Sequence, residues 1–301
     1  MSLLFNAFDI IWKNTDKSDA KRIASLVPPE NIISLTDIPY LNDNNPHHLM
    51  NIHYPKDALT ALPVIIDIHG GGWMYGDKDL NGIYCQYLAS RGFIVITMSY
   101  RLVPEVTIKG QVRDIFASFK KIKAMLPSLP SDPDRIYLTG DSAGGQLAAY
   151  AAAISQNNML ADGFGVKNVF NFEKLILTSP VAYANEKGPV GLYNRMMWGQ
   201  KPSFSPLPKT GLDISDLLDR VEAYPDTLLI TSSGDFVARK QTHRLHDDLI
   251  SRGFSSTILD YPPQNGKPLM HVFAILEPNS DAGRDCIEKT VNFIENKGEA
   301  E

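Results

Sequence analysis

The sequence has few cysteines and no excess of positive charge. Its 301 residues contain two cysteines, Cys85 and Cys286, and neither belongs to a CxxC pair. Zinc and dithiol chemistry are therefore not expected, and two isolated thiols suit a reducing compartment. The formal net charge of -5 argues against nucleic-acid binding, which usually needs a basic face.

Long apolar runs are also missing. No stretch approaches the roughly 20 apolar residues that a membrane-spanning helix requires. The first residues, MSLLFNAFDIIWKN, lack the basic segment and the small-residue cleavage site of a signal peptide. We therefore expect a cytoplasmic protein without stable membrane insertion. The sequence leaves open whether the chain forms a homo-oligomer.

Short apolar runs that alternate with helical patterns predict an α/β fold. The pattern favours one domain over residues 1–301, with a mostly parallel central sheet flanked by helices. Near-continuous runs such as those at 64–66 and 94–96 are typical of strands buried on both faces. The predicted strands are 49–54, 63–68, 93–98, 135–139, 174–178, 227–231 and 257–261. The predicted helices are 80–91, 111–125, 143–156, 239–252 and 281–296.

Two segments fall outside this alternation. In residues 1–30, apolar residues recur at helical spacing: Leu4, Phe8, Ile11 and Trp12. Residues 184–224 are rich in glycine, proline and aromatic residues. Both segments could cover one end of the sheet as a small helical cap. Alternatively, residues 1–30 form only a docked amphipathic helix.

A GxSxG motif, GDSAG at residues 140–144, lies between a predicted strand and a strongly helical segment. Small neighbours allow the sharp strand-to-helix turn that lifts the hydroxyl of a nucleophilic serine out of the sheet. Ser142 is therefore the predicted nucleophile. Ala143 would direct its N–H at the developing oxyanion, near the positive end of the helix dipole. The alternative is a glycine-rich turn with Ser142 as a helix N-cap.

A second glycine motif, HGGGW at residues 69–73, follows the buried run at 64–68. Consecutive glycines let backbone N–H groups point outward, and HGGG is the oxyanion loop of lipases and esterases. We predict Gly71 and Gly72 as donors beside Ala143, with His69 bracing the loop. A phosphate cradle is the alternative, but neither GxxxxGK[ST] nor GxGxxG with an acidic partner is present.

Three histidines follow Ser142: His243, His246 and His271. The first two share one face of a predicted helix, where we expect a solvated surface rather than a metal site, because no third ligand is in view. His271 follows a strand and a Gly/Pro-rich loop. It is the predicted general base, in the chain order Ser, acid, His.

The acid is predicted to be Asp235, in the turn after strand 227–231. A carboxylate at the C-terminal end of a strand is well placed for catalysis in an open α/β sheet. Asp260, which also closes a strand, is the alternative. Asp235 could instead serve only as a helix N-cap.

Together, the HGGGW and GDSAGG motifs resemble the hormone-sensitive-lipase-like branch of the α/β-hydrolases. The segment SYRLVPE at 99–105 is similar to that family's SYRLAPE, and the resemblance covers about residues 60–276. The tryptophan after the glycines also resembles small bacterial carboxylesterases and feruloyl- or acetyl-esterases. Val272 stands where the family's HGF segment has glycine. Asp235-Phe236-Val237 departs from its usual DPL.

The resemblance implies a serine carboxylesterase that cleaves small, short-acyl or aromatic esters through an acyl-enzyme, without metal or cofactor. An amide or formamide hydrolase on the same triad, such as an arylformamidase or peptidase, is the alternative. A non-catalytic binding protein is a third reading. Trp73, Met197 and Trp198 are expected to line the substrate pocket, although each could be an ordinary core residue.

Overall fold

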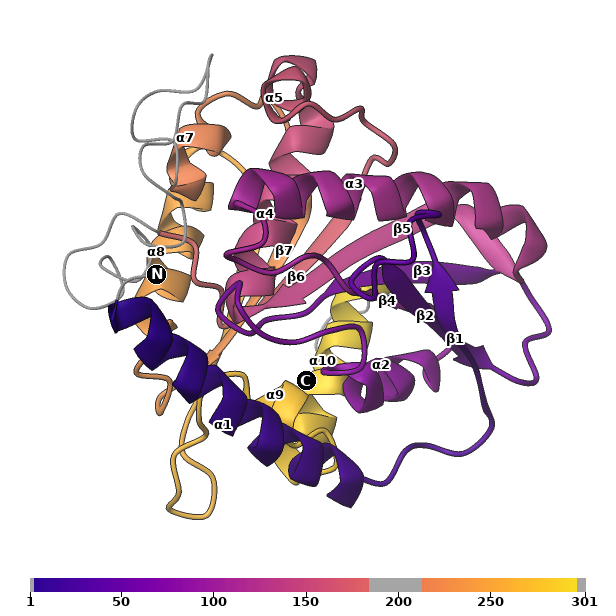
Figure 1. Ribbon diagram of the computed structural model, residues 1–301. Helices are drawn as coiled ribbons and strands as arrows, with labels where there is room; N and C mark the ends of the chain where they lie inside the picture. Colours follow the sequence, from indigo (N-terminus) through magenta and orange to yellow (C-terminus); the bar gives the residue numbers. More distant parts are fainter. Residues whose placement is uncertain (1–2, 184–212, 297–301) are drawn as a thin grey trace.

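The computed structural model describes residues 3–183 and 213–296, with side chains from residue 10 onward. Its centre is an eight-stranded sheet (Figure 1). The strands are β1 Ile32–Pro39, β2 Leu49–Pro55, β3 Leu62–Ile68, β4 Ile94–Met98, β5 Ser131–Asp141, β6 Lys174–Thr178, β7 Asp226–Ser232 and β8 Ser256–Tyr261. They lie in the order β1-β2-β4-β3-β5-β6-β7-β8. The pairs β1/β2 and β2/β4 are antiparallel and the others are parallel.

The helices pack on both faces of this sheet. They are α1 Leu3–Ser25, α2 Gly82–Ala89, α3 Ile108–Met125, α4 Ser142–Gln156, α5 Asn158–Phe164, α7 Ile214–Leu218, α8 Arg239–Ser251, α9 Phe273–Leu276 and α10 Asp281–Ile294, with a 3-10 turn at Leu126–Ser128. Successive residues of a central strand pack into two hydrophobic cores, one on each face of the sheet. Ile66 packs in the core that includes α3 and α4, and Ile65 in the core that includes α2 and α10. Strands buried on both faces explain the continuous apolar runs, and the predicted α/β class is confirmed.

The predicted elements differ from the observed ones mainly at the edges. All seven predicted strands and all five predicted helices are present, with bounds shifted by a few residues. The sequence did not indicate β1, α5, α7 or α9. Strand β1 lies at the sheet edge, with most of its side chains partly or fully exposed and an irregular register between Leu35 and Ile38. An edge strand with so little burial carries a weak alternation signal.

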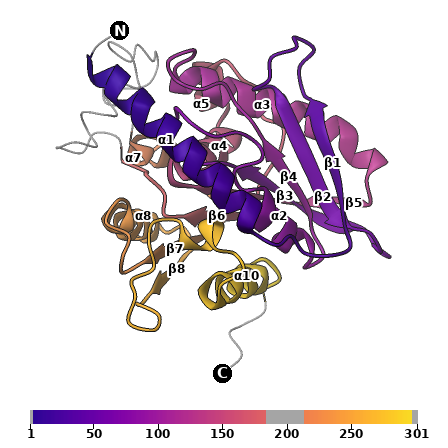
Figure 2. The ribbon, with the colours of Figure 1, turned by 60° about the horizontal axis from the view of Figure 1, so that its bottom comes forward.

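Helix α1 lies across the front of the molecule in Figure 2. Between residues 11 and 20 only Trp12, Thr15 and Asp19 are partly buried. This spacing of three and four residues marks the face turned toward the protein. Ile11, expected beside Trp12 on the apolar face, is instead 53% exposed.

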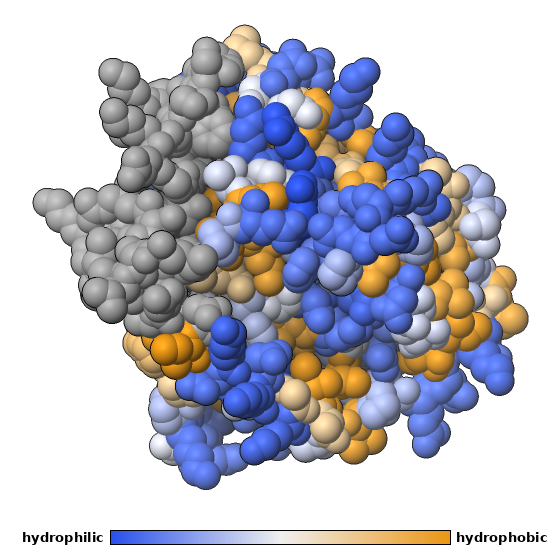
Figure 3. Space-filling model, viewed as in Figure 1, coloured by the Kyte–Doolittle hydropathy of each residue, from blue (hydrophilic) through white to orange (hydrophobic). Residues whose placement is uncertain are grey.

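The surface in Figure 3 is mostly hydrophilic, with apolar side chains in scattered groups. Within residues 3–183 and 213–296, no helix is both long enough and apolar enough to cross a membrane. The apolar side chains instead fill the two cores on either side of the sheet.

Candidate active site

Ser142, His271 and Asp235 form one hydrogen-bonded row. Ser142 Oγ lies 2.9 Å from His271 Nε2, and His271 Nδ1 lies 2.9 Å from Asp235 Oδ1. Ser142 begins α4 directly after β5, His271 lies in the loop after β8, and Asp235 lies in the turn after β7. With the Nδ1 proton directed at Asp235, Nε2 is free to accept the serine proton.

The backbone at Ser142 is strained in the way that a sharp turn requires. Its φ is 50°, in the left-handed region that costs a non-glycine residue about 1–3 kcal/mol. A Cβ on Gly144 would overlap the carbonyl oxygens of Ile68 and His69, and one on Gly140 would lie 2.6 Å from the Gly144 oxygen. The two motif glycines are therefore required by close backbone packing between β3, β5 and α4.

The HGGGW loop also has left-handed backbone. The φ angles of Gly71, Gly72 and Trp73 are 100°, 57° and 62°. The ring of His69 stacks on Tyr100 with centroids 4.3 Å apart, and the Tyr100 hydroxyl donates to the His69 carbonyl at 2.7 Å. Burial lowers the pKa of His69 to about 4, so this ring is neutral at neutral pH and acts as a brace of the loop.

Asp141 links the two glycine motifs. Its Oδ1 accepts hydrogen bonds from the Gly70 N–H at 2.9 Å and from Asn81 Nδ2 at 2.8 Å. The same Asn81 amide reaches Asp67 Oδ2 at 3.1 Å. Burial raises the pKa of Asp141 above its ordinary value, and burial together with the charge of Asp141 raises the pKa of Asp67 to about 8. Asp67 therefore keeps its proton at neutral pH.

The carboxylate of Asp235 is held by several donors. Besides His271, its Oδ1 accepts from the backbone N–H groups of Val237 and Ala238 at 3.0 and 2.9 Å, and its Oδ2 lies 3.3 Å from Thr231 Oγ1. Burial alone would raise the pKa of Asp235, but the hydrogen bond and charge of His271 and the Ala238 N–H lower it below its ordinary value. Asp235 thus partners His271 and also holds the turn before α8; because the N-cap of α8 is Ala238, the alternative that Asp235 serves only as a helix N-cap is wrong.

Asp260 belongs to a different cluster. Its Oδ2 pairs with Arg239 Nη2 at 2.6 Å and with His243 Nε2 at 2.8 Å. His246 contacts Ser256 Oγ at 3.0 Å. Across the part of the chain that the structure describes, no group of three or more His, Cys, Asp or Glu side chains could hold a metal ion.

A pocket of about 590 Å³ opens beside Ser142. The three predicted oxyanion donors, Gly71, Gly72 and Ala143, line it, as does the predicted substrate residue Trp73. The rest of the wall is largely apolar and includes Leu80, Val181, Phe236, Met270, Val272, Ile275 and Leu276. Helix α1 closes one side. Met197 and Trp198, also predicted for the pocket, lie outside the described residues.

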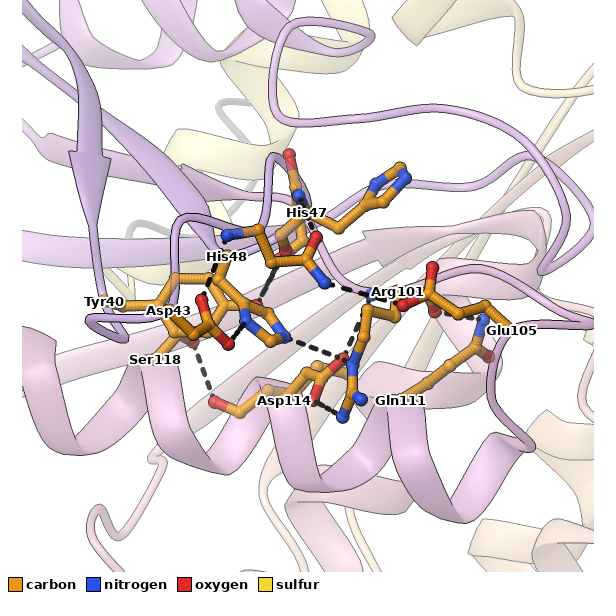
Figure 4. Close-up of polar contacts among 12 residues, drawn as sticks. Tyr40, Asp43, His47, His48, Arg101, Glu105, Gln111, Asp114 and Ser118 are labelled. Carbon is orange, nitrogen blue, oxygen red and sulfur yellow. Dashed lines mark hydrogen bonds and ion pairs between the residues drawn. The ribbon is translucent and has the colours of Figure 1, made fainter.

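A polar network joins the loop before β2 to α3 (Figure 4). His48 lies between Asp43 and Asp114, with Nδ1 2.6 Å from Asp43 Oδ2 and Nε2 3.5 Å from Asp114 Oδ2. The Arg101 guanidinium donates two hydrogen bonds to the Asp114 carboxylate, from Nε at 2.9 Å and from Nη2 at 2.6 Å. The Gln111 side chain donates from Nε2 to the Arg101 carbonyl at 3.0 Å.

Several named or structurally solved esterases resemble this chain. A family model described as BD-FAE matches residues 50–188. The crystal structure of a C6-C4 SN3 inhibited esterase B from Lactobacillus rhamnosis is 31% identical, with a TM-score of 0.92, over 98% of this chain and 97% of that chain. The chain belongs to the hormone-sensitive-lipase-like family of α/β-hydrolase carboxylesterases.

Curated relatives of this carboxylesterase family match shorter parts of the chain. Versiconal hemiacetal acetate esterase of Dothistroma septosporum is 38% identical over 37% of this chain and 35% of its own length. A probable isoprenylcysteine alpha-carbonyl methylesterase of Oryza sativa subsp. japonica is 26% identical over 83% of this chain and 60% of its own length. The chain thus spans less than two thirds of these two relatives. Both names describe these relatives as esterases.

Sequence reasoning missed some residues of this carboxylesterase site. Asp141 stands inside the GDSAGG motif, and its position next to Ser142 was the available signal. Gln111, Asp19 and Arg22 carry no motif. Gln111 lies near the HGGGW loop, and Asp19 and Arg22 lie at the pocket, only because residues far apart in the chain make contact in the fold.

Proposed function

We propose that the protein is a serine carboxylesterase in which Ser142 is the nucleophile, His271 the general base and Asp235 the acid that orients it. The observation that supports this most is the continuous row from Asp235 through His271 to Ser142, with 2.9 Å at each contact. Its chain order, Ser then Asp then His, is that of α/β-hydrolases.

In the proposed reaction, Ser142 Oγ attacks the ester carbonyl carbon while His271 Nε2 takes the hydroxyl proton. The resulting oxyanion accepts hydrogen bonds from the N–H groups of Gly71, Gly72 and Ala143, and each such donor contributes about 3 kcal/mol. His271 then gives its proton to the leaving alcohol oxygen as the C–O bond breaks. Water, activated by His271, attacks the acyl-serine, the acid leaves and Ser142 regains its proton.

We propose small esters with short acyl or aromatic groups as substrates. A pocket of about 590 Å³ falls in the size range of small-molecule sites, roughly 300–1,000 Å³. Esterase B of Lactobacillus rhamnosis, 32% identical in a second structure, is inhibited there by a C4-C4 SN3 tributyrin phosphonate, which supports short chains. Trp73 would contact the substrate from the pocket wall, and Met197 and Trp198 stay predictions.

The remaining assignments are proposals of the same kind. A single catalytic unit over residues 1–301, with a cap from residues 1–30 and 184–224, is supported by the pocket-facing side of α1. The partner is a small-molecule ester, and neither nucleic acid nor a metal or organic cofactor enters the proposed reaction. Location in the cytoplasm and assembly into a homo-oligomer stay predictions.

The test is Ser142→Ala in the full chain. Hydrolysis of p-nitrophenyl acetate should fall by at least about 10³-fold, because the nucleophile is lost while the fold is kept. Ser251→Ala, at an exposed position of α8, is the control and should retain full activity. Unchanged hydrolysis in Ser142→Ala, or no labelling of the parent protein by a fluorophosphonate, would refute the proposal.

A further inference from the structure

Helix α1 brings a polar patch to an otherwise apolar pocket. Four of its residues, Trp12, Thr15, Asp19 and Arg22, line the pocket that contains Ser142. Their spacing places them on one face of the helix. The patch is therefore part of the wall that a bound ester would touch.

This face is attached to the segment after the HGGGW loop. The ring of Trp12 stacks on Tyr75 with centroids 5.6 Å apart and planes 13° apart. The Tyr75 hydroxyl donates to Asp19 Oδ2 at 3.1 Å. The stacking and the hydrogen bond hold α1 in one place against the pocket, so that its polar side chains have defined positions.

One nitrogen of Arg22 has no partner in the described part of the chain. Nε donates to Asp19 Oδ1 at 2.8 Å and Nη1 to the Leu276 carbonyl at 3.3 Å. Nη2 is buried and makes no hydrogen bond with any described residue. Buried donors are nearly always paired in native proteins, so an unpaired donor in a pocket wall points to an acceptor on the ligand.

The charges around Arg22 indicate which acceptor fits. Both carboxylate oxygens of Asp19 are engaged, one by Arg22 and one by Tyr75, so the charge of Arg22 already has its counter-charge. The other titratable groups that line the pocket are Asp141 at the end of β5, His271 in the loop after β8 and the Tyr75 hydroxyl in the segment after β3. This balance leaves no net positive charge to attract an anion. A neutral oxygen is the acceptor that it favours.

We propose that Arg22 determines specificity by donating a hydrogen bond from Nη2 to a neutral oxygen of the substrate outside the scissile ester group. The preferred substrates are then short esters that carry a second ester, ether or hydroxyl oxygen. This inference rests on the proposed esterase function and adds the substrate class to it.

The first experiment needs only the unmodified protein. Two pairs of esters of equal shape are compared: p-nitrophenyl pentanoate with p-nitrophenyl 3-methoxypropanoate, and butyl butyrate with 2-methoxyethyl butyrate. The ratio of kcat/KM within each pair is divided by the ratio of alkaline hydrolysis rates, to remove intrinsic reactivity. The ether ester should be favoured about tenfold in at least one pair, since a hydrogen bond to a charged group has that strength. Ratios near one in both pairs overturn the inference.

The second experiment assigns the preference to Arg22. Arg22→Met keeps an unbranched side chain, shorter than that of arginine, and removes every donor, so the preference should fall to about one. The double variant Asp19→Asn/Arg22→Met tests the same point without leaving Asp19 unpaired. Lys21→Met, exposed on the same helix, is the matched control and should keep the preference. An equal fall for both esters of a pair in the double variant overturns the assignment.

The same measurements distinguish a wrong substrate class from a wrong esterase function. If monobutyl succinate, which carries a carboxylate, is favoured over the neutral ether ester, the proposed substrate class is wrong. If the unmodified protein hydrolyses none of these esters, or if Ser142→Ala hydrolyses them equally well, the esterase function itself fails. Normal hydrolysis of the hydrocarbon esters without an ether preference refutes only the role of Arg22.

Discussion

The side-chain amide of Gln111 donates a hydrogen bond of 2.9 Å to the backbone carbonyl of Trp73. Trp73 closes the HGGGW loop with a φ of 62°, a conformation that an aromatic residue adopts only when its surroundings enforce it. The Val103 N–H donates to the same carbonyl at 2.9 Å. Fully buried Gln111 therefore helps to hold the strained end of the proposed oxyanion loop.

Gln111→Leu should lower kcat by about tenfold with little change in KM. Loss of the amide donor frees Trp73 to relax, which moves the N–H groups of Gly71 and Gly72 away from the oxyanion, and these groups act mainly in the transition state. Steady-state kinetics on p-nitrophenyl butyrate measure both constants. Gln156→Leu, at the half-buried C-terminal end of α4, is the control. A rise in KM at constant kcat in Gln111→Leu would show that Gln111 does not act through the loop.

Asp235→Asn and Asp260→Asn should behave differently. Asp235→Asn should reduce kcat by up to about 10⁴-fold, because the amide disfavours the tautomer of His271 that accepts the Ser142 proton. Asp260→Asn breaks the contacts with Arg239 and His243 at a partly exposed site away from Ser142, so activity should stay within about twofold and stability within about 1 kcal/mol. Kinetics together with thermal unfolding of both variants check this. Equal losses of activity in the two variants would contradict the assignment of Asp235, and not Asp260, as the acid of the triad.

Gly144→Ala should be far more damaging than Gly82→Ala. The added methyl at position 144 would meet the Ile68 and His69 carbonyl oxygens, which belong to the backbone and cannot move aside. We expect a loss of at least about 3 kcal/mol or no folded protein. At Gly82, the first residue of α2, nothing lies within 4 Å of a Cβ, and alanine should stabilise by up to about 1 kcal/mol. Urea unfolding distinguishes the two, and a tolerated alanine at position 144 would contradict the packing described above.

Asp67→Asn should change how stability depends on pH. Burial and the nearby Asp141 raise the pKa of Asp67 to about 8 in the folded protein, whereas in the unfolded chain it lies near 4. Between these values the folded state binds the extra proton, so the contribution of Asp67 to the free energy of unfolding falls as the pH rises from about 4 to 8. The amide that replaces the carboxyl group in this variant binds no proton and retains the carbonyl acceptor for Asn81.

The gain in stability from Asp67→Asn, relative to the parent protein, should therefore be larger at pH 8 than at pH 5. Urea unfolding at the two pH values measures it. Asp57→Asn, at an exposed position, corrects for the change in net charge. If the parent protein and Asp67→Asn lose stability in parallel as the pH rises, Asp67 does not carry a proton in the folded state.

The sequence was most informative where a site depends on neighbouring residues. GDSAG between a strand and a helix, and HGGGW after a buried strand, reflect local backbone demands that few residue types satisfy. Both motifs indeed occupy left-handed, closely packed backbone. The parallel sheet followed from runs buried on both faces. Edge strand β1 gave a weaker pattern because its side chains are little buried.

Asp235 and Asp260 illustrate the limit of strand-end reasoning. Both close a strand, and nothing local separates them. The position of β8 beside Arg239 and His243 turns Asp260 away from the site, while the turn after β7 brings Asp235 to His271. The choice depends on which side chains meet across the sheet, and a single sequence carries no record of that.

The sequence itself determined the residue types at the two glycine motifs, the position of Ser142 between a strand and a helix, and the α/β class, because local backbone geometry and burial on both faces leave direct patterns. The tertiary structure decided which face of α1 meets the pocket, that Asp141 joins the two motifs, and that Gln111 holds Trp73. Those relationships arise from contacts across dozens of residues, where packing against distant elements, and not local propensity, selects the partner.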